Sequence, residues 1–120
     1  MPAIPAFLLK KLYVKNSLKN TPAGVQLELK NTLAPGTIIG GAPVAVDGTE
    51  YPPADTVLVS ADVERAFAEV SKDQPLTFGI NTSVIIRLKG VELGPGPHKI
   101  SIPVLTKEAG ELKIEVSDTI

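Results

Sequence analysis

Apolar and polar residues alternate along four stretches of the chain. In residues 25–30, VQLELK, every odd-numbered position is apolar and every even-numbered position is polar. Residues 84–89, 100–104 and 112–116 carry the same period of two on at least one face. This period is typical of a β-strand with one face in a core and the other in water. The four stretches therefore predict an all-β, antiparallel protein.

Glycine and proline divide these strands in a way that predicts hairpins. Asp47-Gly48 stands between two short predicted strands, residues 44–46 and 49–51, and such a pair favours a type I′ turn, in which both central residues have positive φ. Residues 94–97, GPGP, and Ala109-Gly110 separate the last three strands, which we predict to form a three-stranded antiparallel meander. Pro103 has no N–H to donate, which predicts an edge strand or a bulge at that position.

One segment has a helical period instead. From Val63 to Val70, apolar residues stand at i, i+3, i+4 and i+7, with charged residues between them. This spacing predicts one short amphipathic helix near residues 62–71, with Asp62 as its N-cap and Phe67 against the sheet. An irregular loop is the alternative. The chain as a whole is predicted to be a single domain over residues 1–120, an antiparallel β-sandwich of about eight strands with this one helix.

The first fourteen residues are apolar without a clear period. An apolar strand that is not amphipathic is buried on both sides or lies against another chain. Because a strand in a small sandwich turns only one face to the core, we predict that residues 1–14 form an interface strand, with ordinary burial as the alternative. The candidate interface residues are Ile4, Phe7, Leu8, Leu9, Leu12 and Tyr13.

Composition and charge narrow the class of partner. The chain has 120 residues, of which 43% are hydrophobic and 21% charged, and its formal net charge is −1. These values are ordinary for a soluble globular protein and predict no nucleic-acid or membrane partner. Residues 1–30 hold five lysines and one glutamate, whereas residues 41–75 hold seven acidic and two basic residues. This asymmetry either steers a partner or reflects solvated strand faces.

Few residues offer chemistry. The sequence has no cysteine and one histidine, His98, which excludes a thiol nucleophile, a disulfide and a Cys/His zinc site. We predict that His98 is a turn residue with local hydrogen bonds. A role as general base, or as a metal ligand with Asp47, Asp55 or Asp62, is the alternative. No catalytic, cofactor-binding or metal-ligating residue is therefore predicted, and the absence of cysteine and of a signal-peptide pattern favours the cytoplasm.

Three segments carry a family resemblance: residues 45–53, residues 88–100 and residues 110–118. In these turns and strands the chain resembles the small β subunit of C-glycoside-deglycosylating enzymes, over residues 15–118. The resemblance implies a β-sandwich that packs on a TIM-barrel α subunit, which holds the divalent metal and the acid and base residues. A looser similarity to hydroxymethylglutaryl-CoA reductase is set aside here, because a chain this short without a dinucleotide fingerprint could not be that enzyme alone.

The predicted function follows from these points. We expect a non-catalytic accessory subunit that packs on a catalytic, TIM-barrel-like partner, or a module that assembles as a homo-oligomer. A small-ligand or carbohydrate-binding module is the alternative, although two tyrosines, three phenylalanines and no tryptophan offer little aromatic surface for a sugar. Part of an enzyme that uses His98 is the third reading.

Overall fold

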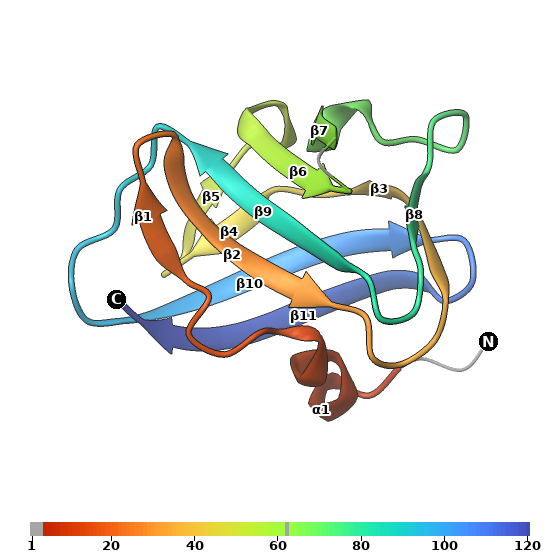
Figure 1. Cartoon of the computed structure of the whole chain (residues 1–120), viewed down its shortest axis with the longest axis horizontal. Coiled ribbons are helices and arrows are strands. Elements are labelled where there is room, and N and C mark those ends of the chain that lie inside the picture. Colours follow the sequence, from red (N-terminus) through yellow and green to blue (C-terminus); the bar gives the residue numbers. More distant parts are fainter. Residues whose placement is uncertain (1–3, 62) are drawn as a thin grey trace.

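The protein is built from two antiparallel sheets that pack face to face (Figure 1). The computed structural model describes residues 4–61 and 63–120. In spatial order, the first sheet contains β1 (Lys19–Thr21), β2 (Gly24–Lys30), β9 (Ser83–Lys89), β6 (Thr56–Ser60) and β7 (Val63–Ala66). The second contains β5 (Thr49–Tyr51), β4 (Val44–Val46), β10 (Pro97–Thr106), β3 (Gly36–Gly41) and β8 (Leu76–Phe78), with β11 (Gly110–Thr119) on the other side of β10. This confirms the predicted all-β antiparallel sandwich.

The alternating residues form the core between the sheets. Val25, Leu27 and Leu29 of β2 are each at most 4% exposed, and they face the interior together with residues of β9 and β10. Ile100 and Ile102 of β10 are exposed by 2% and 0%. Burying each such side chain contributes about 1.5–3 kcal/mol relative to leaving it exposed. The period of two therefore fixes which face of each long strand points inward.

The described residues contain eleven strands, against about eight predicted. The additional strands are short. β1 and β8 have three residues each and lie at the ends of the strand order in their sheets, whereas β5, equally short, is the second strand of the hairpin predicted at Asp47-Gly48. A three-residue strand shows too little alternation to be recognised from periodicity alone.

The predicted helix near residues 62–71 is wrong. Val63–Ala66 is strand β7, which pairs with β6 from Val57↔Ala66 to Ser60↔Val63, and Phe67–Glu69 is a single 3₁₀ turn, η3. Val63, which the helix would have turned inward, is 58% exposed. Pairing with the edge of β6 stabilises this segment as a strand, whereas a helix of about eight residues is marginal on its own. Asp62, the predicted N-cap, lies outside the described residues.

The predicted N-terminal interface strand is also wrong as secondary structure. The segment forms the short helix α1 (Ala6–Leu9) and the 3₁₀ turn η1 (Lys10–Leu12), followed by an isolated bridge from Tyr13 to Leu29. Residues 1–3 are outside the described part. A helical turn presents apolar residues at spacings that do not alternate, which explains the missing period of two.

The predicted three-stranded meander is correct only in its second half. β10 and β11 pair along their whole length, from Pro97↔Thr119 to Thr106↔Gly110. β9, however, belongs to the other sheet, where it pairs with β2 and β6. Residues 90–96 therefore cross from one sheet to the other, at the left of Figure 1, instead of forming a hairpin.

Pro103 lies inside the central strand β10 and not in an edge strand. On one side it pairs with Lys113 of β11. On the other side β4 pairs up to Ser101 and β3 begins at Val104, so Pro103 faces the gap between these two strands. Its carbonyl accepts a hydrogen bond from the Ala42 N–H at 3.2 Å. The missing N–H points toward the same gap, where no ladder bond is lost.

Two remaining features complete the fold. Pro53–Asp55 forms the 3₁₀ turn η2 before β6. None of the helices in residues 4–61 and 63–120 has the length and apolar character that crossing a membrane requires.

Candidate functional site

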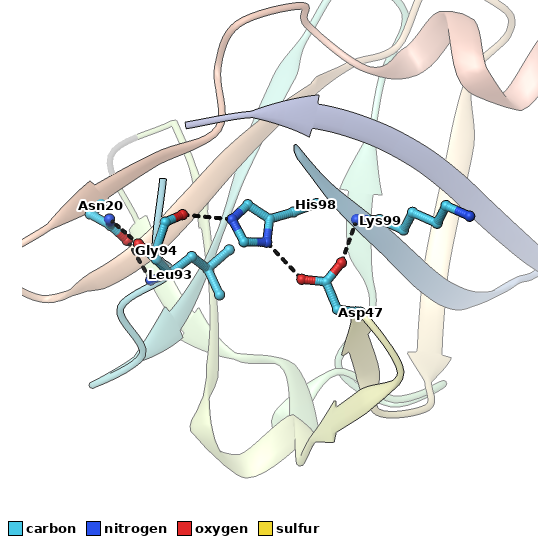
Figure 2. A network of polar contacts seen from close by, with 6 residues as sticks. All are labelled: Asn20, Asp47, Leu93, Gly94, His98 and Lys99. Atoms are coloured by element: carbon cyan, nitrogen blue, oxygen red, sulfur yellow. Dashed lines mark hydrogen bonds and ion pairs between the residues drawn. The ribbon is translucent and has the colours of Figure 1, made fainter. Parts of the chain in front are cut away.

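His98 is the centre of a polar network at one end of the sandwich (Figure 2). Its Nδ1 lies 2.6 Å from Oδ2 of Asp47, and its Nε2 lies 2.7 Å from the carbonyl oxygen of Gly94. His98 stands near the start of β10, Asp47 in the β4–β5 turn and Gly94 in the crossover between the sheets. The network therefore joins three segments that are separate in the sequence.

The backbone holds Asp47 in place for this contact. Asp47 has φ 52° and Gly48 has φ 87°, which confirms the predicted type I′ hairpin turn. Its carboxylate Oδ1 accepts the Lys99 N–H at 2.9 Å, and its own N–H donates to the Lys99 carbonyl at 2.8 Å. Asp47 is thus bound to the backbone of β10 as well as to the imidazole.

A second pair of hydrogen bonds secures the crossover. The Asn20 side chain of β1 donates to the Leu93 carbonyl at 2.8 Å and accepts the Leu93 N–H at 2.9 Å. Figure 2 shows that this pair lies next to Gly94, the carbonyl partner of His98. Leu93 is therefore held by β1 of the first sheet, whereas Gly94 is bound to His98 of the second sheet.

The geometry favours the doubly protonated imidazolium. A carboxylate and a carbonyl oxygen are both acceptors, so both ring nitrogens must donate for both contacts to be hydrogen bonds. The Asp47 carboxylate, and next the Gly94 carbonyl, raise the pKa of His98 above its ordinary value of 6.5. The His98 contact, followed by the Lys99 N–H, lowers the pKa of the Asp47 carboxyl below 3.8.

These shifts predict a pH-dependent stability. His98 has the higher pKa in the folded state, so its contribution is complete below about pH 6.5 and is lost as the pH rises through the folded value. The Asp47 contribution is present above about pH 4 and is lost as the pH falls through its lowered folded pKa. Wild type should therefore exceed His98→Asn in urea midpoint most at about pH 5.5, and the difference should shrink at about pH 8.5.

The single histidine makes this measurement direct. The imidazole signals of the folded protein in an NMR titration all belong to His98, and their midpoint should lie above 6.5. Asp47→Asn should return the midpoint toward 6.5 because it removes the carboxylate. A wild-type midpoint at or below 6.5 would contradict the assignment of an imidazolium.

The contacts of His98 support a structural role of this residue better than a catalytic one. Both nitrogens of His98 contact acceptors of the protein itself, and its side chain is 12% exposed. Of the candidate metal partners, Asp47 is brought to His98, Asp55 lies in η2, and Asp62 is outside the described residues. Within the described ranges, no three histidine or acidic side chains are grouped so that they could hold a metal ion.

A second polar contact attaches the N-terminal segment to β11. The Tyr13 hydroxyl donates to Oδ2 of Asp118 at 2.5 Å, and the Asn16 N–H donates to the same oxygen at 2.9 Å. Burial, and then the Asp118 carboxylate, raise the pKa of Tyr13 to about 12. The bond from Tyr13 lowers the pKa of Asp118. No sequence pattern links these two positions.

The six candidate interface residues differ in how deeply they are buried. Leu9 and Leu12 are 4% and 7% exposed and belong to the core. Ile4 and Tyr13 are half-buried and pack against it, and Leu8 is also half-buried. Phe7 differs from them, because 66% of it is exposed. Phe7 is therefore the member of the set whose side chain is most accessible to a partner.

Comparison with known proteins identifies the family. The family model described as "Hydroxymethylglutaryl-CoA reductase, N-terminal domain" matches residues 8–120. The chain belongs to this family. No curated protein matches it. The family of N-terminal domains indicates an accessory or structural domain of an enzyme family, which is consistent with a domain that is not catalytic alone.

The match corrects the resemblance drawn from the sequence. The relation to the small subunit of C-glycoside-deglycosylating enzymes is wrong, because residues 8–120 match the reductase N-terminal domain instead. The segments that suggested the former relation are hairpin turns and alternating strands, which unrelated β-sandwiches share. The looser similarity to the reductase was set aside for lack of a dinucleotide fingerprint. An N-terminal domain needs no such motif of its own.

Proposed function

We propose that this protein is a non-catalytic accessory domain that packs, through α1, on the catalytic part of a hydroxymethylglutaryl-CoA reductase. Membership in the family of N-terminal domains supports the choice of partner. The polar network supports a structural role, since both nitrogens of His98 are engaged by Asp47 and Gly94.

The exposure of Phe7 supports the choice of α1 as the docking surface. Leu9 and Leu12 fasten the helical segment to the core, while Phe7 on the same segment is 66% exposed. Lys10 and Lys11 stand beside it and are exposed as well. An aromatic side chain surrounded by polar residues is the usual composition of an energetically important contact.

The test measures binding to the catalytic part of the reductase from the same source. Calorimetric titration of the intact domain should give a saturable complex, and Phe7→Ser should raise its dissociation constant by about tenfold or more. Val63→Ser is the matched control, since Val63 is 58% exposed but lies on β7 of the first sheet. That variant should bind as wild type does.

Other outcomes would contradict the proposal. Equal losses for Phe7→Ser and Val63→Ser would show that α1 is not the docking surface. A Phe7-dependent dimer of the domain alone, without binding to the reductase, would favour self-assembly instead. Hydride transfer to hydroxymethylglutaryl-CoA by the isolated domain would contradict the non-catalytic role.

A further inference from the structure

A cavity of about 160 Å³ lies between the two sheets. Its rim combines the β2–β3 loop, the β10–β11 turn and the N-terminal segment, at the end of the sandwich where β8 is drawn in Figure 1. Native interiors are close-packed and have few voids larger than a water molecule. A space of this size inside a small sandwich is therefore unusual, and it is large enough for a small ligand.

The inner wall of the cavity is apolar and contributed by both sheets. Leu58, Val84 and Ile86 of the first sheet are each at most 4% exposed. Ile102 and Val104 of β10 oppose them from the second sheet. Such walls do not hold water, because a buried water needs two to four polar partners.

The rim is accessible from solvent. Ala34 and Pro35 of the β2–β3 loop are exposed, and Ala109 of the β10–β11 turn is half-buried. Leu33 and Leu112, also half-buried, continue the apolar lining from this rim toward the interior. An apolar molecule can therefore approach the cavity along an apolar surface.

Asn31 at the rim is fully engaged by the protein. Its amide nitrogen donates to the carbonyl oxygens of Ala34 and Phe78, both at 2.7 Å. Its amide oxygen accepts the N–H groups of Leu33 at 3.1 Å and Ala34 at 3.3 Å. An amide side chain has two donors and two acceptor positions, so none remains for a ligand.

The other polar side chains that line the cavity also form hydrogen bonds within the protein. The Glu108 carboxylate accepts the N–H and the hydroxyl of Thr37, both at 2.8 Å. The Thr106 hydroxyl donates to the Gly110 carbonyl at 2.9 Å. A ligand carboxylate placed at this rim would also meet the negative charge of Glu108. The apolar walls and the negative charge of Glu108 therefore favour a neutral molecule without strong hydrogen-bonding groups.

We propose that this cavity binds one small, neutral, apolar molecule of about the size of benzene. The volume supports this size, since an apolar cavity of about 150 Å³ in another protein stays dry and binds benzene or xenon. Filling the space restores dispersion contacts that the walls of an empty cavity lack. The inference does not rest on the proposed docking through α1, although Leu9 of α1 and Leu12 of η1 also line the cavity.

Benzene is the probe for the first test. Titration of the intact domain should shift the methyl NMR signals of Val84, Ile86 and Val104 in a saturable way, with a dissociation constant on the order of 1 mM. The methyl signals of Val46 and Val116, which are buried but do not line the cavity, should stay unchanged. A linear response, or shifts that include Val46 and Val116 equally, would overturn the proposal.

Two comparisons test the preference for an apolar ligand and the location of the binding site. Phenol, which adds one hydroxyl, should bind at least about tenfold more weakly than benzene because its hydroxyl loses hydrogen bonds to water when it is buried between the apolar walls. Ala109→Leu should narrow the rim and weaken benzene binding about tenfold, whereas Ala68→Leu, at an exposed position of η3 outside the cavity, should not. If Ala109→Leu does not fold, the phenol comparison decides alone. Equal affinity for benzene and phenol would contradict an apolar site.

Discussion

Gly24→Ala is expected to lower the free energy of unfolding by at least about 3 kcal/mol. Gly24 has φ +138°, a conformation that residues with a Cβ rarely adopt. A Cβ here would also lie 2.0 Å from the carbonyl oxygen of Leu88. That oxygen belongs to the backbone of β9, which pairs with β2 over seven positions and cannot move without disturbing the first sheet. Urea unfolding followed by circular dichroism measures the loss.

Two other glycines separate the causes of this loss. Gly90 has φ +70° but nothing within 4 Å of an added Cβ, so Gly90→Ala should show the backbone strain alone, about 1 kcal/mol. Gly94 has open space and no positive φ, so Gly94→Ala should be nearly neutral. A loss for Gly24→Ala no larger than that for Gly90→Ala would show that contact with Leu88 does not matter.

The long strands could be predicted because burial on one side imposes a period that the sequence displays. Val25, Leu27 and Leu29 alternate with polar residues in the sequence and are buried in β2, and Ile100 and Ile102 do the same in β10. The turn at Asp47 was also predictable, because the positive φ of its two central residues is a local requirement. Where the structure depends only on the geometry of a local turn or on one buried strand face, the sequence pattern predicts the structure.

Residues 63–70 could not be predicted because their conformation depends on a distant partner. The spacing of Val63, Phe67 and Val70 fits a helix, but a strand followed by a 3₁₀ turn also buries Phe67 and Val70. The choice is made by the edge of β6, with which β7 pairs. Periodicity contains no information about the availability of that edge.

The candidate site around His98 could not be predicted from the sequence for a similar reason. His98 and Asp47 were both recognised as residues of tight turns, but they are 51 positions apart, and only the pairing of β4 with β10 within the second sheet brings them within 2.6 Å. The crossover through residues 90–96, predicted as a hairpin, is what places Gly94 on the other ring nitrogen. The cavity is a property of how side chains fill the space between sheets, and no single stretch of sequence encodes it.

Gly41→Ala is the second substitution with a large expected effect, at least about 3 kcal/mol in the free energy of unfolding. A Cβ at Gly41 would lie 2.0 Å from Cζ of Phe67 and 2.7 Å from the carbonyl oxygen of Pro103. The Phe67 ring is 3% exposed and lines the cavity, so the cavity offers space into which the ring can be displaced. Phe67→Leu should therefore reduce the cost of Gly41→Ala by about 1 kcal/mol or more in a double-mutant cycle. Additive losses would contradict this coupling. If Gly41→Ala remains folded, its displaced ring should also weaken benzene binding, which connects the stability of the core to the occupancy of the cavity.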